Sequence, residues 1–115
     1  MRKSLEDLIF LGRIEKDVNL FDKTWKMVTL NSTEHLAATN ATADFDTLTR
    51  FFALKVQIIS RSLKQVNDIV LDDLEETYKF VEKLQPIVIN KLYEEYEKIQ
   101  LKQSESLKDM DEIKN

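Results

Sequence analysis

The chain of 115 residues contains no cysteine, one histidine, one glycine and one proline. Without cysteine it can form no disulfide, thiolate zinc site or iron–sulfur cluster, and it has no thiol nucleophile. One histidine excludes metal sites built on two histidines. One glycine excludes the glycine-rich phosphate loops of P-loop and Rossmann proteins, which need several residues without a Cβ. The sequence therefore predicts an intracellular protein that binds no nucleotide through these loops.

Charged residues are plentiful, with 17 basic and 21 acidic side chains and a net charge of −4. Residues 1–71 carry 10 basic and 9 acidic side chains, and residues 72–115 carry 7 and 12, so the two parts sum to +1 and −5. A phosphate-binding surface needs clustered Lys and Arg, and this distribution argues against nucleic acid as the main partner. No apolar run is long enough to span a bilayer, and acidic Glu6 and Asp7 interrupt any signal sequence, so we expect neither secretion nor a membrane partner.

The first 30 residues predict a short helix followed by a β-hairpin. Ser4 to Leu11 has helical apolar spacing with Gly12 as its terminator. Residues 13–20 alternate apolar and polar side chains, residues 24–30 are rich in β-branched and aromatic types, and residues 21–23 supply a turn. Because an isolated hairpin is marginal in water, its apolar face is expected to rest on other elements.

The rest of the chain has mainly helical patterns. Asn31 and Glu34 form a capping box, Asp44 is the expected cap of the next helix, Asp72 and Glu75 form a second box, and Pro86 suits the first position of a last helix. The helix after Asp44 has the widest apolar stripe and is the predicted core helix, comprising Phe45, Leu48, Phe51, Phe52, Val56, Ile58, Ile59, Leu63 and Val66. The predicted fold is α+β and mostly helical, with an N-terminal β-hairpin, a bundle of about three to four helices and a long C-terminal helix.

The last helix determines the predicted domain limits. From Pro86 to Lys114 it would be about 43 Å long, which exceeds the width of a domain of this size. Its apolar stripe is interrupted at Gln103. We therefore predict a globular domain over residues 1–103, and an acidic helical extension or frayed tail over residues 104–115 that pairs with a partner or frays.

No grouping of residues predicts an enzyme. His35 is an isolated acid/base candidate with no orienting partner in the sequence, and the paired carboxylates lie at helix starts, where capping accounts for them. We predict no catalytic residue, no cofactor, no metal and no small-molecule substrate. Partner-binding residues are predicted instead, because aromatic and apolar side chains occur on a short strand and along the last helix. Trp25, on the strand, could belong either to the core or to a partner contact. The predicted set is Trp25, Leu92, Tyr93, Tyr96, Ile99 and Leu107.

Several stretches resemble the small tail-assembly and baseplate-assembly proteins of tailed bacteriophages. They are Val28-Thr29-Leu30 followed by Glu34, Asp46-Thr47-Leu48-Thr49-Arg50 leading into Ala53-Leu54-Lys55-Val56, and Leu84-Gln85-Pro86 leading into Leu92-Tyr93-Glu94-Glu95-Tyr96. Together they cover most of residues 8–107. None of these stretches is catalytic.

The resemblance implies a non-enzymatic, chaperone-like factor of tail or baseplate assembly. Its implied partners are other tail or baseplate proteins and further copies of itself, and its implied location is the host cytoplasm during assembly, with retention in the virion left open. One alternative is a small structural subunit of the mature virion in the baseplate, tail or neck, whose hairpin extends a neighbour's sheet. A second alternative is a small helical regulatory protein.

Overall fold

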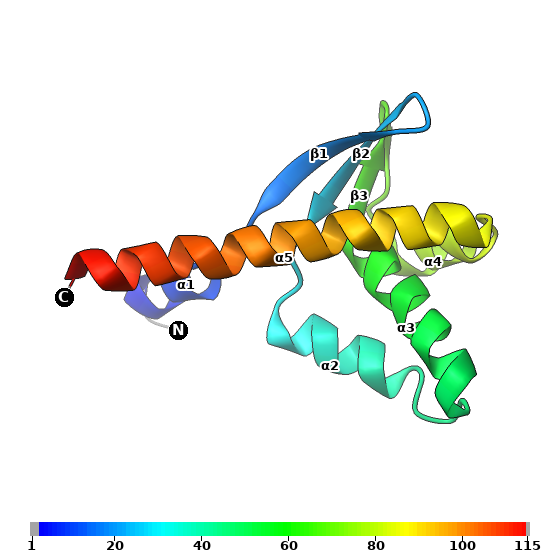
Figure 1. Cartoon of the computed structure of the whole chain (residues 1–115), viewed down its shortest axis with the longest axis horizontal. Coiled ribbons are helices and arrows are strands. Elements are labelled where there is room, and N and C mark those ends of the chain that lie inside the picture. The colour runs from blue at the N-terminus through cyan, green and yellow to red at the C-terminus, as the bar shows by residue number, and fades with distance from the viewer. Residues whose placement is uncertain (1–2, 115) are drawn as a thin grey trace.

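The computed structural model describes the backbone of residues 3–114 and the side chains of residues 5–108. Its elements, in chain order, are α1 (Lys3–Ile9), β1 (Glu15–Leu20), β2 (Lys23–Val28), α2 (Ser32–Asn40), α3 (Thr47–Ser62), β3 (Leu63–Val66), β4 (Ile69–Val70), α4 (Leu74–Glu82) and α5 (Pro86–Lys114). In Figure 1, α5 runs along the longest dimension of the molecule, and α1 lies near its C-terminal half. The predicted fold class is confirmed: the chain is α+β and mostly helical, with an N-terminal hairpin and a long last helix.

The sheet has four antiparallel strands in the order β1-β2-β3-β4, so the N-terminal hairpin is extended by a second one. In the first hairpin Leu20 pairs with Lys23 across a two-residue turn in which Phe21 and Asp22 both have positive φ. This is the conformation that suits the right-handed twist of a hairpin. Trp25 of β2 lies opposite Val66 of β3.

The prediction that the core helix continues to Val66 is wrong, because a second hairpin begins at Leu63. Helix α3 ends at Ser62, and the next four residues form β3. The turn that follows is held by Asn67, whose φ is 53° and whose side-chain Oδ1 accepts a hydrogen bond from the Thr24 backbone N at 3.0 Å. The Asn67 backbone N donates to the Thr24 carbonyl oxygen at 2.8 Å. Pairing with β2 therefore prevails over the helical spacing of Leu63 and Val66.

Helix starts follow the local signals closely. Asn31 and Glu34 form the predicted capping box of α2, and α5 begins at Pro86 as predicted. Two cap predictions are off by one or two residues: Asp46 rather than Asp44 caps α3, and Asp73 rather than Asp72 caps α4. In both helices the aspartate that accepts the backbone N–H is the one next to the first helical residue.

The core lies where α3 and α5 meet the sheet, and its fully buried members come from β2, α2, α3, β3, α4 and α5. Its centre comprises Met27, Ile59, Leu63, Val81, Ile89, Leu92, Tyr96 and Ile99. The predicted core stripe is wrong over the first turns of α3 and just before them, because Phe45, Leu48, Phe51 and Phe52 are 37% to 85% exposed. Only the half of α3 from Val56 onward contributes fully buried residues.

Two contacts attach the N-terminal segment to the second half of α5. Gly12 has a φ of +85°, and a Cβ at this position would lie 3.1 Å from Leu107 Cδ1. The Gln103 amide Nε2 donates a hydrogen bond to the Gly12 carbonyl oxygen at 2.9 Å. The helix thus keeps contacts with the chain's own α1–β1 connection at and beyond Gln103. The division into residues 1–103 and 104–115 stays a prediction.

A buried serine connects the end of α3 to the sheet, and its removal is expected to be costly. Ser62 Oγ donates to the Val28 carbonyl oxygen at 2.7 Å and accepts from the Val28 backbone N at 3.2 Å. Ser62→Ala removes both bonds in a buried site and should lower the free energy of unfolding by about 1–3 kcal/mol in a urea titration.

Ser60→Ala is the matched control, since it removes a second buried hydroxyl from the same helix. The Ser60 hydroxyl donates only to the Val56 carbonyl oxygen one turn earlier. Its loss should cost less than about 1 kcal/mol, because it leaves no strand group without its partner. Equal losses for the two variants would contradict the role of Ser62 in joining helix and sheet.

Candidate protein-binding groove

Four of the six predicted partner-binding residues lie in the core instead. Trp25, Leu92, Tyr96 and Ile99 are each at most 5% exposed. The Trp25 indole Nε1 donates to the Leu20 carbonyl oxygen at 3.0 Å, and the Tyr96 hydroxyl accepts from the Leu30 backbone N at 3.1 Å. A partner could not reach these side chains without unfolding the domain. This corrects the prediction: the apolar stripe of α5 is covered by the chain's own helices and sheet.

The other two predicted residues remain at the surface. Tyr93 is half-buried, stacks on Tyr96 with ring centroids 6.4 Å apart, and has Lys55 Nζ 5.5 Å from its ring centroid. Burial, followed by the charge of Glu97, raises the pKa of Tyr93 above its ordinary value. Leu107 is partly exposed and lies against Gly12. A partner-binding role for Tyr93 and Leu107 stays a prediction.

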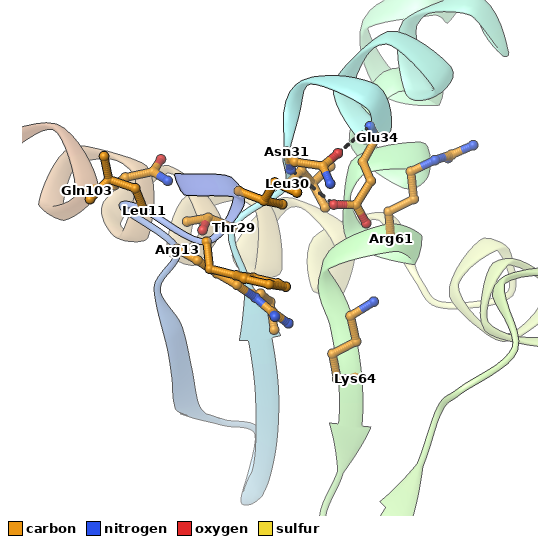
Figure 2. Close-up of a pocket in the computed structure, with 12 residues that line it drawn as sticks. Leu11, Arg13, Thr29, Leu30, Asn31, Glu34, Arg61, Lys64 and Gln103 are labelled. Carbon is orange, nitrogen blue, oxygen red and sulfur yellow. Dashed lines mark hydrogen bonds between the residues drawn. The ribbon is translucent and has the colours of Figure 1, made fainter. Parts of the chain in front are cut away.

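A surface cavity of about 280 Å³ lies where α1, the sheet, α2, the end of α3 and α5 come together. Figure 2 shows its walls: Leu11 and Arg13 from the α1–β1 connection, Leu30 and Glu34 from the start of α2, and Lys64 from β3. Further lining residues are Ile9, Phe10, Val28, Thr29, Asn31, Arg61 and Gln103. Segments far apart in the sequence therefore build a single concavity.

Backbone hydrogen bonds fix the walls of this cavity. The Ile14 backbone N donates to Thr29 Oγ1 at 3.0 Å, and the Thr29 backbone N donates to the Ile14 carbonyl oxygen at 2.9 Å. On the opposite wall, Glu34 Oε1 accepts from the Asn31 backbone N at 3.0 Å while Asn31 Oδ1 accepts from the Glu34 backbone N at 2.9 Å. The Glu34 carboxylate is thus held in place by its capping role.

Basic side chains dominate the charge of the cavity, which is lined by Arg13, Arg61 and Lys64 against one carboxylate, Glu34. The Arg13 guanidinium lies 5.8 Å from the centroid of the Phe10 ring. The Arg61 guanidinium donates through one nitrogen to the carbonyl and the side-chain oxygen of Gln57. Burial lowers the pKa of Arg61, and the negative charge of Glu34 opposes this effect. Among the side chains that the structure describes, none of these three cations lies within 4.0 Å of a carboxylate oxygen.

A second, more apolar hollow of about 430 Å³ adjoins this cavity and shares Glu34, Arg61 and Lys64 with it. It extends past Leu63 to Val70, Leu71 and Leu74, with Asp72 at this end. We call the two hollows together the basic groove. Its first part is polar and cationic, and its second part adds the apolar side chains of Ala37, Leu63, Val70, Leu71 and Leu74 among polar ones.

Large apolar side chains are exposed in two places: on α1 with the two residues that follow it, and on the first turns of α3 with Phe45 just before them. The α1 apolar face comprises Leu5, Leu8, Ile9, Phe10 and Leu11, each 50% to 61% exposed, and it adjoins the basic groove. The α3 aromatic face comprises Phe45, Leu48, Phe51 and Phe52. Beside it a hollow of about 320 Å³ is lined by Thr39, Arg50 and Leu54 together with two of these phenylalanines. Contiguous exposed apolar side chains of this kind are typical of protein interaction surfaces.

Sequence reasoning did not find the groove, because its basic residues carry no common spacing. Arg13 lies 48 residues before Arg61, and Lys64 follows in a strand that was expected to be helix. The α3 aromatic face did leave a signal in the sequence, namely an apolar stripe wider than one neighbouring helix can cover. That width predicted additional neighbours, and the chain itself does not supply them along the first two turns.

Residues associated with acid/base or metal chemistry do not converge in the groove. His35 Nε2 lies 3.4 Å from the Tyr96 hydroxyl and 3.5 Å from the Gln100 amide nitrogen, beneath α5. Within the described residues, no three His, Asp or Glu side chains are grouped so that they could hold a metal ion. No described helix combines the length and apolar character needed to cross a membrane.

Comparison of the chain with family models, with curated proteins and with solved structures gave no match in any of the three cases.

Proposed function

We propose that the chain is a non-enzymatic protein-binding factor that acts, like an assembly chaperone, in building the tail or baseplate of a tailed bacteriophage. The observation that carries the proposal is the α3 aromatic face. Leu48, Phe51 and Phe52 in the first turns of α3, and Phe45 just before the helix, remain exposed, although the residues that α3 buries begin at Val56. The phage setting comes from the resemblance of the stretches around Thr29, Thr47 and Pro86 to assembly proteins of that kind.

Burial of the α3 aromatic face by a partner would be energetically favourable. Moving a large apolar side chain out of water contributes roughly 1.5–3 kcal/mol when the burial is complete. On the α3 aromatic face this gain is not realised within the chain, because Leu48 is 85% and Phe51 67% exposed. A partner that covers the face would recover this free energy.

Photocrosslinking in phage-infected cells tests the proposal. A benzophenone amino acid at position 48 should crosslink to a tail or baseplate protein, whereas the same group at position 23, in the exposed first hairpin, should not. Phe51→Glu should then weaken association with the crosslinked protein by about 1–3 kcal/mol, with little change in the urea melt. Crosslinks from both positions alike, or only to host proteins, would contradict the proposed function.

The structural-subunit alternative predicts a different stoichiometry. An assembly chaperone leaves the particle when its work is finished, whereas a virion subunit is retained in a fixed copy number. Mass spectrometry of purified particles distinguishes the two. A constant ratio of this chain to the major tail protein would replace the chaperone role by the structural one.

A further inference from the structure

Among the side chains that the structure describes, the first cavity of the basic groove carries more positive than negative charge. We propose that it binds an acidic segment of the protein partner, with a partner carboxylate among Arg13, Arg61 and Lys64 and partner apolar side chains on the α1 apolar face. This inference rests on the proposed function, because it gives the chemistry of the partner that such a factor would hold.

The first cavity of the groove has a charge opposite in sign to the net charge of the chain. The chain has a net charge of −4, yet the first cavity of the groove is lined by three cations and one carboxylate, a local sum of +2. That carboxylate belongs to Glu34, which already accepts the Asn31 backbone N–H as part of the capping box. Electrostatic complementarity at an interface selects a partner of opposite charge, here an acidic one.

The cations of the groove are positioned to bind a carboxylate. Arg61 is only partly accessible, and burial disfavours its charged form. One guanidinium nitrogen is occupied by Gln57, which leaves the other N–H groups for a ligand. A planar carboxylate matches the fork of an arginine, and a charge-assisted hydrogen bond is stronger than a neutral one. Arg13 and Lys64 approach the same cavity from the α1–β1 connection and from β3 (Figure 2).

Apolar side chains on both sides of the cations favour a peptide ligand over a small anion. Ile9, Phe10 and Leu11 line the cavity beside the cations and remain at least half exposed. On the other side the groove continues over Val70, Leu71 and Leu74. Apolar surface on both sides of a cationic centre fits an extended segment in which leucine-like side chains flank an acidic one. A free oxyanion would leave both apolar parts uncovered.

The test uses two synthetic probes that differ only in charge. The acidic probe is the peptide acetyl-Leu-Asp-Glu-Leu-Phe-amide, and its matched control is acetyl-Leu-Asn-Gln-Leu-Phe-amide. Binding is followed by amide chemical-shift changes of the labelled full chain. We expect the acidic peptide to bind about tenfold more tightly, which corresponds to one charge-assisted contact. The difference should shrink as salt is raised from about 0.02 M to about 0.3 M.

Paired charge variants show whether the groove is the binding site. Arg61→Gln with Lys64→Gln should abolish the preference for the acidic peptide. Lys16→Gln with Lys23→Gln changes the net charge equally at exposed hairpin positions outside the groove, and it should leave the preference intact. Circular-dichroism melts of both double variants confirm that they fold.

Several outcomes would overturn the proposal. They are equal binding of the two peptides, no binding of either at about 5 mM, an equal effect of the two double variants, or inorganic phosphate that binds as tightly as the acidic peptide at the same residues. Tighter binding of a short oligothymidylate would assign the groove to nucleic acid. A partner still crosslinked at position 48 after any of these results would preserve the proposed function, so the two failures can be told apart.

Discussion

Tyr96→Ala is expected to lower the free energy of unfolding by about 3–5 kcal/mol, the usual cost of removing a buried aromatic side chain. Tyr96 is fully buried, and its hydroxyl accepts the Leu30 backbone N–H and lies 3.4 Å from His35 Nε2. Its ring packs in the core where α5 meets the end of β2. Urea titration followed by circular dichroism measures the loss. Ile87→Ala, on the same helix but 66% exposed, is the control and should change stability by less than about 0.5 kcal/mol.

Tyr96→Phe separates the contribution of the hydroxyl from that of the ring. It keeps the ring and should cost about 1–3 kcal/mol, because the buried Leu30 N–H loses its acceptor. Burial, the main cause, raises the pKa of Tyr96 above its ordinary value of 10.0. The neutral phenol is therefore favoured in the folded state, and its contribution is complete below pH 10 and lost as the pH rises further. The phenylalanine variant should lose less stability than the parent chain in this alkaline range, and an identical alkaline loss would contradict the burial of the hydroxyl.

Ile59→Ala should lower the free energy of unfolding by about 2–5 kcal/mol, whereas Phe52→Ala should cost less than about 1 kcal/mol. The two residues are seven apart on one stripe of α3, and the sequence gives them the same weight. In the structure Ile59 is fully buried and Phe52 is 37% exposed. Urea melts of both variants measure the difference. A larger loss for Phe52→Ala than for Ile59→Ala would mean that the chain's own core reaches the first turns of α3.

The features that could be predicted depend on neighbouring residues. The capping box of Asn31 and Glu34, the helix start at Pro86 and the period-two alternation of the first hairpin each occupy a few consecutive positions, and all three form as expected. For the capping box and the helix start, local chemistry decides, because the groups that satisfy the backbone donors lie within one turn of the chain. The hairpin is joined by a two-residue turn, although its outermost pair, Glu15 and Val28, lies 13 positions apart. The fold class follows from their order.

The features that could not be predicted depend on distant residues. Periodicity identifies the apolar side of α3 and α5 but not which turns the chain itself covers. It therefore predicts Leu48 in the core and Tyr96 at an interface, whereas Leu48 is 85% exposed and Tyr96 is fully buried. The strand after Ser62 forms because β2 offers free backbone groups there, which no local pattern records. The basic groove has the same origin, since Arg13 and Lys64 come together only when the sheet has formed.

The attachment of the α1–β1 connection to α5 has a consequence for how the protein is made. Gln103 donates to Gly12 across 91 positions of the chain, and Tyr96 accepts from Leu30 across 66. A ribosome adds residues at roughly 5–20 per second, and the N-terminal part of a chain leaves it first. The buried side chains of the hairpin, such as Trp25 and Met27, therefore lack the α5 part of the core for several seconds, until that helix has emerged.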